Sequence, residues 1–101
     1  MNSRGLGRLL VIVRVAKKLG KSWVARHEKD GLDEWKIATF VRSQYLLGSF
    51  ERTEPDIAMF RFRFRKGGGK LVQATLWARE RKQYGIVELV VYKGHVEPIE
   101  S

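Results

Sequence analysis

The segment from Ala58 to Arg79 reads AMFRFRFRKGGGKLVQATLWAR, and its pattern decides the fold that the sequence predicts. Apolar and basic residues alternate up to the glycine run at 67–69, and a second alternating segment follows it. Alternation with a period of two is typical of a β-strand with one buried face, and glycines favour a turn between two such strands. We therefore predict a hairpin with strands over residues 57–65 and 70–79.

Symmetric pairing across residues 66–70 predicts which side chains of this hairpin share a face. The apolar face then pairs Phe64 with Val72, Phe62 with Ala74 and Phe60 with Leu76. The opposite face carries Arg61, Arg63, Arg65, Gln73, Thr75 and Trp77. A slip of one residue would turn every side chain of one strand to the wrong face, so the separation of apolar from polar residues supports this register.

A third strand is predicted over residues 86–93, joined to the second by a loop over 80–85. In this register the apolar face pairs Ala74 with Val91, Leu76 with Leu89 and Ala78 with Val87. The polar face gains Glu88, Val90 and Tyr92, and Glu88 is expected beside Trp77. The three strands thus form an antiparallel meander with one apolar face.

The N-terminal half supplies one more strand and two helices. Residues 8–16 are almost continuously apolar, which is typical of a central strand covered on both faces. Ser22 and Asp33 are suitable N-caps for helices over 22–30 and 33–47, which Gly31 and Gly48 would end. Residues 48–56 are expected to form a loop. The prediction is a single α+β domain over 1–101, with an ordered core at about 8–95, the order βααβββ and both helices on one face of the meander.

The helix over 33–47 is apolar on more than one side. Trp35, Ala38, Val41 and Tyr45 form a stripe, whereas Phe40 and Leu47 lie off it. We therefore expect this helix to contact a partner chain, and a homodimer through it is one hypothesis.

The charge of the chain predicts a polyanionic partner. The formal net charge is +9, with eight Lys and Arg in residues 1–29 and five in residues 61–70, two clusters that could meet in space. Nucleic acid, an acidic protein and an anionic membrane surface are the candidates. No cysteine and no long apolar run are present, which favours a cytoplasmic protein without a membrane-spanning segment.

The alternating arginines could form a nucleic-acid site. Their spacing of about 7 Å along a strand is close to that of successive phosphates, and aromatic rings nearby could stack on bases. A solvated outer face is the alternative, although three neighbouring arginines repel one another. The predicted nucleic-acid-binding residues are Arg61, Arg63, Arg65, Lys66, Lys70, Gln73, Trp77, Tyr92 and Lys93.

Three residues are candidates for catalysis of RNA cleavage. Glu88 could act as a general base on a ribose hydroxyl, Arg63 could stabilise the phosphorane charge, and His95 could act as acid or base. The alternative for Glu88 is a cross-strand ion pair. His27 is expected on the surface, and two histidines without ligand spacing predict no metal site; no cofactor is expected. KGGGK joins two strands and is predicted to be a hairpin tip rather than a phosphate loop.

The order βααβββ and the run DIAMFRFRFRKGGGKLVQATLWARERKQYGIVELVVYKGH (56–95) resemble the RelE/HigB superfamily of type II toxin ribonucleases, particularly its phage-associated branch. In that branch a strand reading roughly LxELRxRxGGG leads into a β-meander that ends near LxxGxxK. The resemblance covers about residues 33–95. It implies a ribonuclease that cleaves mRNA without metal, commonly on the ribosome, and that an acidic or helical antitoxin neutralises.

Under this resemblance, Arg61 and Arg63 fall on the strand arginines of the family, and Lys93 and His95 on its terminal basic positions. The chain departs from the family at residues 71–74, where Leu, Val, Gln and Ala replace the usual Arg and Tyr, and at 96–101, where the tail is not rich in lysine. The alternative function is a non-catalytic nucleic-acid-binding or host-enzyme-inhibiting protein of a phage or mobile element.

Overall fold

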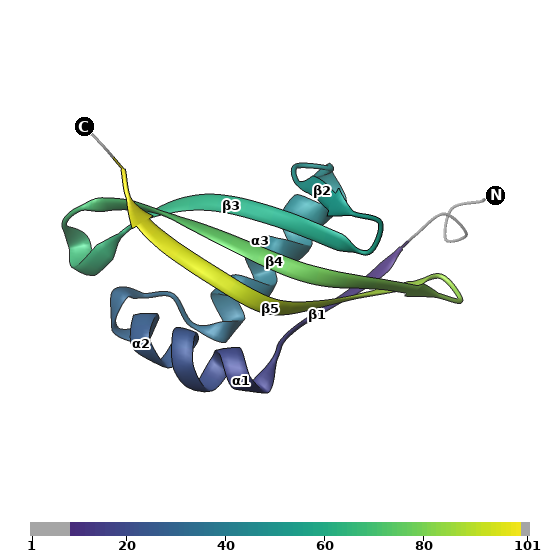
Figure 1. Cartoon of the computed structure of the whole chain (residues 1–101), viewed down its shortest axis with the longest axis horizontal. Helices are drawn as coiled ribbons and strands as arrows, with labels where there is room; N and C mark the ends of the chain where they lie inside the picture. The colour runs from purple at the N-terminus through teal and green to yellow at the C-terminus, as the bar shows by residue number, and fades with distance from the viewer. Residues whose placement is uncertain (1–8, 100–101) are drawn as a thin grey trace.

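A mixed sheet of five strands forms one layer of the structure, a computed structural model that describes residues 9–99 (Figure 1). The strands are β1 (Leu10–Val15), β2 (Glu51–Glu54), β3 (Ile57–Arg65), β4 (Leu71–Gln83) and β5 (Ile86–Pro98). Their order is β1-β5-β4-β3-β2, and β1 runs parallel to β5 while every other pair is antiparallel. The predicted α+β class is confirmed.

Two helical segments form the other layer. The first contains α1 (Lys17–Leu19), the π-helical η2 (Gly20–Val24), α2 (Ala25–His27) and the 3-10 turn η3 (Glu28–Asp30), so it begins five residues before the predicted start at Ser22. The second is α3 (Glu34–Leu47), close to the predicted range. The Asp33 side chain accepts a hydrogen bond from the Lys36 amide at 2.8 Å, and Gly48 ends the helix at a φ of 75°, a conformation that favours glycine.

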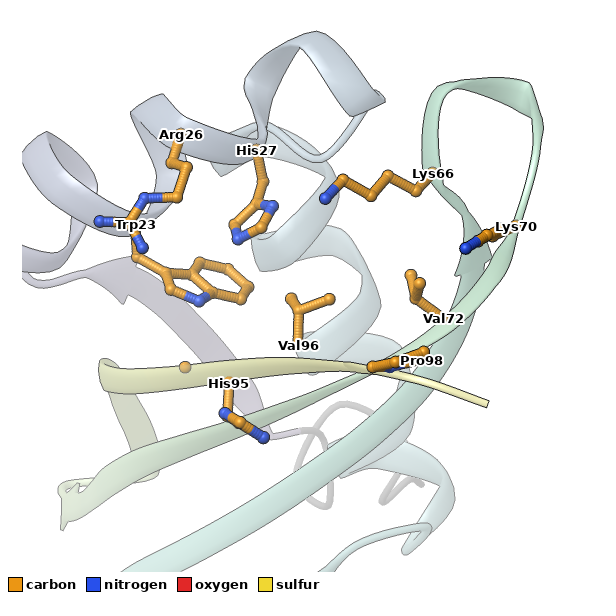
Figure 2. Close-up of a pocket in the computed structure, with 10 residues that line it drawn as sticks. Trp23, Arg26, His27, Lys66, Lys70, Val72, His95, Val96 and Pro98 are labelled. Atoms are coloured by element: carbon orange, nitrogen blue, oxygen red, sulfur yellow. The ribbon is translucent and has the colours of Figure 1, made fainter. Parts of the chain in front are cut away.

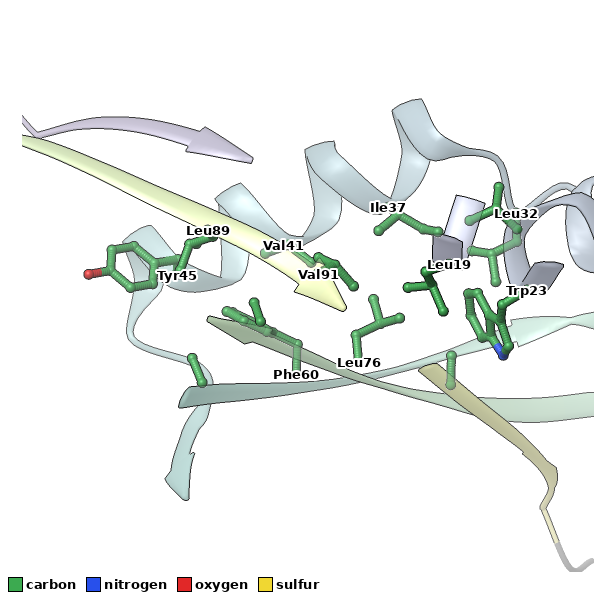
Figure 3. Close-up of a cluster of buried hydrophobic side chains, with 14 of the residues drawn as sticks. Leu19, Trp23, Leu32, Ile37, Val41, Tyr45, Phe60, Leu76, Leu89 and Val91 are labelled. Atoms are coloured by element: carbon green, nitrogen blue, oxygen red, sulfur yellow. The ribbon is translucent and has the colours of Figure 1, made fainter. Parts of the chain in front are cut away.

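The core lies between the helices and one face of the sheet (Figure 3). Phe60, Leu76, Leu89 and Val91 from the sheet and Ile37 and Val41 from α3 are completely buried. Leu19 and Trp23 extend the core under the first helical segment. Burying a side chain of this size contributes about 1.5–3 kcal/mol, so this cluster fixes the sheet against α3.

The predicted register of the β3–β4 hairpin is correct at every pair. Phe60 lies opposite Leu76, Phe62 opposite Ala74 and Phe64 opposite Val72. The predicted register of β4 and β5 is wrong by four or five residues: Ala78 pairs with Val91 instead of Val87, and Leu76 with Gly94 instead of Leu89. The reason is that β4 continues to Gln83, and a two-residue turn replaces the predicted loop over 80–85.

A β-bulge interrupts the β4–β5 pairing between Trp77 and Ala78. Trp77 pairs with Lys93 and Ala78 with Val91, so Tyr92 is the extra residue. A bulge of one residue reverses the alternation of side chains along the bulged strand. Lys93 and His95 therefore lie on the face away from the helices, and β5 continues to Pro98, beyond the predicted end at 93.

Two further predictions about strands are wrong. The segment predicted as a central strand is an edge strand, because β1 pairs only with β5 and leaves Leu10 and Ile12 exposed on the outer face. Its predicted first residue, Arg8, lies outside the described residues. The predicted loop over 48–56 contains β2, which pairs with the start of β3.

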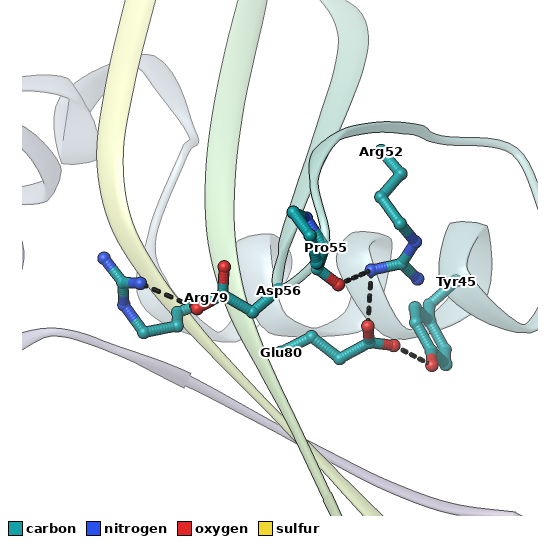
Figure 4. Close-up of polar contacts among 6 residues, drawn as sticks. All are labelled: Tyr45, Arg52, Pro55, Asp56, Arg79 and Glu80. Atoms are coloured by element: carbon teal, nitrogen blue, oxygen red, sulfur yellow. Dashed lines mark hydrogen bonds and ion pairs between the residues drawn. The ribbon is translucent and has the colours of Figure 1, made fainter.

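A polar network fixes the end of the sheet where β3 begins (Figure 4). Tyr45 of α3 donates a hydrogen bond to the Glu80 carboxylate, and Arg52 Nη1 of β2 donates to the same carboxylate at 2.5 Å. Arg52 also donates to the carbonyl oxygen of Pro55 at 3.0 Å, and Arg79 pairs with Asp56 at 2.9 Å. The Glu80 side chain is only 5% exposed and thus joins α3, β2 and β4.

The turn between β4 and β5 predicts a stabilising substitution. Tyr84 and Gly85 both have positive φ, 51° and 77°, as a type I′ turn requires, and asparagine followed by glycine is preferred there. Because Tyr84 is 92% exposed, Tyr84→Asn should relieve about 1 kcal/mol of backbone strain without loss of packing. We expect thermal denaturation to show a melting temperature higher by roughly 4 °C or more. Gly85→Ala, the control, should lower it, and a lower melting temperature for Tyr84→Asn would contradict this turn geometry.

Candidate nucleic-acid interface

The sheet face away from the helices, here called the open face, carries most of the predicted binding residues. Its side chains form cross-strand rows, because paired residues of neighbouring strands point to the same side. One row contains Arg61, Thr75 and His95, and the next contains Arg63, Gln73 and Glu97. Since strands lie about 4.8 Å apart, the first and last residues of each row are about 10 Å apart in their backbones.

The three arginines of β3 differ in their partners. Arg61 pairs with Glu51 of β2 at 2.9 Å, and Arg65 donates a hydrogen bond to the carbonyl oxygen of Gly69 at 3.2 Å. For Arg63, no ion pair with a carboxylate occurs within residues 9–99, and its side chain is exposed. Arg63 is therefore the arginine of this strand best placed to bind an external anion.

Two aromatic rings of the open face lie under cations. The Lys93 ammonium is 4.7 Å from the centroid of the Trp77 ring, and the Arg79 guanidinium is 5.2 Å from that of Tyr92. The bulge at Tyr92 makes the first contact possible, because it brings Lys93 opposite Trp77. Each of β4 and β5 thus contributes one aromatic ring and one cation to the open face, beside the strand that carries the three arginines.

Glu88 is not part of this group, which corrects the predicted position beside Trp77. In the observed register it lies opposite Arg81 and forms an ion pair with Arg14 of β1. Arg81 is eight residues along β4 from Gln73, the partner of Arg63, which corresponds to about 27 Å. The predicted catalytic set is therefore not assembled, since Arg63 and His95 share one end of the open face while Glu88 lies at the other.

Lys66 and Lys70 also lie away from the open face. They stand at the tip of the β3–β4 hairpin and line a pocket on the helix side of the sheet, together with Arg26 and His27 (Figure 2). His27 was expected on the surface, but it is 8% exposed. The pocket was not predicted from sequence; the only sequence signal was the pair of basic clusters, one of which supplies Arg26 and the other the two lysines.

His95 is a further titratable group of the open face, besides the Glu51 carboxylate that pairs with Arg61. Its Nε2 lies 3.4 Å from the Oε1 atom of Glu97, and the cross-strand row brings it near Arg61. Glu97 was not among the predicted site residues, because the predicted strand ended at residue 93. A base beside a carboxylate thus shares a cross-strand row with a guanidinium, with Thr75 between them, and such groups can bind phosphate and move a proton.

Other kinds of site have less support within residues 9–99. No three His, Asp or Glu side chains cluster there as a metal site would require. No helix in that range is long and apolar enough to cross a membrane. Trp35 and Leu47 of α3 are more than two thirds exposed, and the homodimer through residues 33–47 stays a prediction.

Comparisons of the chain with protein-family models, with curated proteins and with solved structures found no match. The resemblance to the RelE/HigB superfamily therefore stays a hypothesis, and the function has to be argued from the residues of the open face.

Proposed function

We propose that this protein binds single-stranded nucleic acid, RNA above all, along the open face. The observation that carries the proposal is the strand of three arginines beside two aromatic rings on the same side of one sheet. Sheets that present rings and cations in this way bind single strands by stacking bases and pairing phosphates. The net charge of +9 would attract such a ligand from a distance.

The cations above Trp77 and Tyr92 do not prevent base stacking. An exposed cation–π contact contributes about 0.5–1 kcal/mol, whereas a base stacked on an aromatic side chain contributes about 1–3 kcal/mol. A base can therefore displace Lys93 from the Trp77 ring. The released ammonium then lies beside the stacked nucleotide, where its phosphate can pair with it.

Substitution of Arg63 tests the proposal. We expect Arg63→Ala to weaken binding of a labelled single-stranded RNA about tenfold in fluorescence anisotropy, because one phosphate contact is lost. The slope of log K against log salt should become smaller by about 0.7, the value for one phosphate on a single strand.

Arg42→Ala is the matched control for this experiment. Arg42 lies on α3, in the helical layer, and is exposed, so its removal changes the net charge equally without touching the open face. The control should retain nearly the affinity of the unmodified protein. Equal losses for Arg63→Ala and Arg42→Ala would mean that RNA is held by the overall charge, and the open face would not be the site.

A second candidate function is cleavage of the bound RNA, as the RelE/HigB resemblance implies. The arrangement that favours it is His95 beside Glu97 and in the same cross-strand row as Arg61. His95 would accept the proton of a ribose 2′-hydroxyl as its oxygen bonds to phosphorus, and the imidazolium would return that proton to the 5′-oxygen as its bond to phosphorus breaks, while Arg61 stabilises the phosphorane charge. Such an enzyme would act in the cytoplasm, on free RNA or on the ribosome, and an acidic antitoxin would cover the same basic face.

The cleavage hypothesis has its own experiment. Labelled RNA is incubated with the protein and a metal chelator, with and without ribosomes, and its length is followed on a gel. Shortening that is lost in His95→Ala but retained in Glu88→Ala would support catalysis at this end of the open face, since Glu88 lies about 27 Å along the strands from the row of Arg63. Binding without shortening under either condition would favour the non-catalytic protein, whether it coats nucleic acid or blocks a host enzyme.

A further inference from the structure

We infer that the protein has a second anion site, on the helix side of the sheet, which binds a phosphate monoester. This site is the pocket between the first helical segment, the tip of the β3–β4 hairpin and the end of β5 (Figure 2). The inference goes beyond the proposed function, because the pocket lies on the opposite side of the sheet from the open face.

The charges around the pocket favour an anion. Arg26, Lys66 and Lys70 line it with exposed cationic side chains, and no Asp or Glu is among its lining residues within the described chain. Figure 2 shows Lys66 extending from the hairpin tip toward His27. Like charges around one cavity without an acidic lining residue favour an anion there, because it would reduce their mutual repulsion.

The lysines are held at the rim by the backbone of the hairpin. The Lys66 amide donates a hydrogen bond to the carbonyl oxygen of Lys70 at 2.9 Å, which closes the loop between them. Gly67 and Gly68 have φ values of 56° and 76°, which a glycine adopts without strain. The glycine run therefore brings two lysines to the same side of a narrow loop. It is not a phosphate loop in the usual sense, and the phosphate ligands would be the lysine side chains.

His27 is the buried polar side chain in the wall of the pocket. It is buried to about nine tenths, and within residues 9–99 its Nδ1 and the Oδ2 atom of Asp30 have no hydrogen-bond partner. The two atoms are 3.5 Å apart, beyond normal hydrogen-bond length. Unpaired buried polar atoms are rare and costly. A phosphate beside Nε2 would orient the imidazole so that Nδ1–H donates to Asp30, which satisfies both atoms.

The floor of the pocket is apolar and suits the organic part of such a ligand. Trp23 packs against the backbone of β5 at Gly94, where an added β-carbon would lie only 2.8 Å from the indole Cε2 atom. Val72 and Val96 continue this floor beneath the cations. The volume, about 490 Å³, is in the range of pockets for small ligands. A nucleoside monophosphate and the 5′-phosphate end of a nucleic-acid strand both combine a phosphate monoester, which the cations could bind, with a base, which could pack on the apolar floor.

The test is a titration followed by amide chemical shifts in NMR. We expect uridine 5′-monophosphate to shift the amides of residues 26, 27, 66–70 and 94 in a saturable way, and inorganic phosphate to shift the same set more weakly. The double variant Lys66→Ala/Lys70→Ala should bind the nucleotide at least tenfold more weakly. The matched control, Lys17→Ala/Arg42→Ala, also removes two positive charges, but from exposed positions of the helical layer outside both the pocket and the open face, and should bind the nucleotide normally.

Comparison of two RNA strands distinguishes the sources of the phosphate and separates this inference from the proposed function. If a 5′-phosphate strengthens RNA binding relative to a 5′-hydroxyl, and the lysine variant loses that difference, the ligand is a strand end. If only the free nucleotide binds the pocket, the ligand is a small molecule. Absence of saturable shifts with both nucleotide and phosphate, or equal losses in the two double variants, would overturn the inference whatever happens to RNA on the open face.

Discussion

Phe60→Ala is expected to lower the free energy of unfolding by about 3–5 kcal/mol, the usual cost of truncating a buried phenylalanine. Phe60 is completely buried between the sheet and α3, and its ring lies 5.4 Å from that of Phe50. Domains of this size have a stability of about 5–15 kcal/mol, so the loss is a large part of the total. Urea denaturation followed by circular dichroism measures it, with the slope m compared to exclude a change in the extent of unfolding.

Phe64→Ala is the matched control on the same strand and the same face. Phe64 is only half-buried, and its ring contacts that of Phe62 near an open groove beside α3. We expect a loss of about 1–2 kcal/mol, because less apolar area is removed from the core. Similar losses for Phe60→Ala and Phe64→Ala would mean that α3 covers the whole of β3, which contradicts the observed packing.

The hairpin of β3 and β4 could be predicted from sequence because all the relevant signals are local. Alternation fixes the faces, and the five residues from Lys66 to Lys70 fix the register. The arginines of β3 and the ring of Trp77 therefore lie on one face, as the sequence predicted. The positions of these residues depend on no contact outside the hairpin.

The register of β4 and β5 could not be predicted because it depends on a contact from another part of the chain. The polar run ERKQY at 80–84 is typical of a loop, and Glu80 stands on the core face of β4, where an isolated carboxylate would be costly. Tyr45 and Arg52 satisfy that carboxylate, and the strand continues to Gln83. Because of this error in register, Glu88 was predicted opposite Trp77, four positions from Arg81, its observed partner on β4. The predicted catalytic residues Arg63, Glu88 and His95 therefore do not lie together in the structure.

The position of β1 and the pocket on the helix side were missed for a similar reason. A continuous apolar run is typical of a buried strand, but Leu10 and Ile12 of β1 are exposed on the open face, where no layer covers them within residues 9–99. His27 and Lys66 are 39 positions apart, so only the folded chain shows that they line one cavity. Local patterns carry no information about such distant contacts.

The carboxylate of Glu80 predicts how stability depends on pH. Burial would raise the pKa of Glu80, but the hydrogen bonds from Arg52 and Tyr45 hold it below its ordinary value. The folded chain thus binds this proton less readily than the unfolded chain, whose glutamates titrate near pH 4.3. The stabilisation is complete above that value and is lost as the pH falls through the lower pKa of the folded state. Burial and the Glu80 carboxylate raise the pKa of Tyr45 to about 12. The folded chain therefore holds this proton more firmly than the unfolded chain, and the stability that Tyr45 adds is lost as the pH rises from about 10 to the higher pKa of the folded state.

Glu80→Gln should therefore lower the free energy of unfolding by about 2 kcal/mol at neutral pH, because charge-assisted hydrogen bonds to a buried carboxylate are lost. The value lies below that for a fully buried pair because the Arg52 side chain is 36% exposed. The difference from the unmodified protein should shrink steadily below about pH 4, as Glu80 itself becomes protonated. Urea denaturation at a series of pH values measures it.

Glu54→Gln separates this local effect from the general effect of removing a negative charge. Glu54 is an exposed residue of β2, two positions from Arg52, and it forms no side-chain hydrogen bond or ion pair within the described chain. Its substitution should change the stability by less than about 0.5 kcal/mol at any pH. A pH-independent loss in Glu80→Gln would mean that the glutamine fits the site poorly for steric reasons. In that case the ionised carboxylate would not be what joins α3 and β2 to β4.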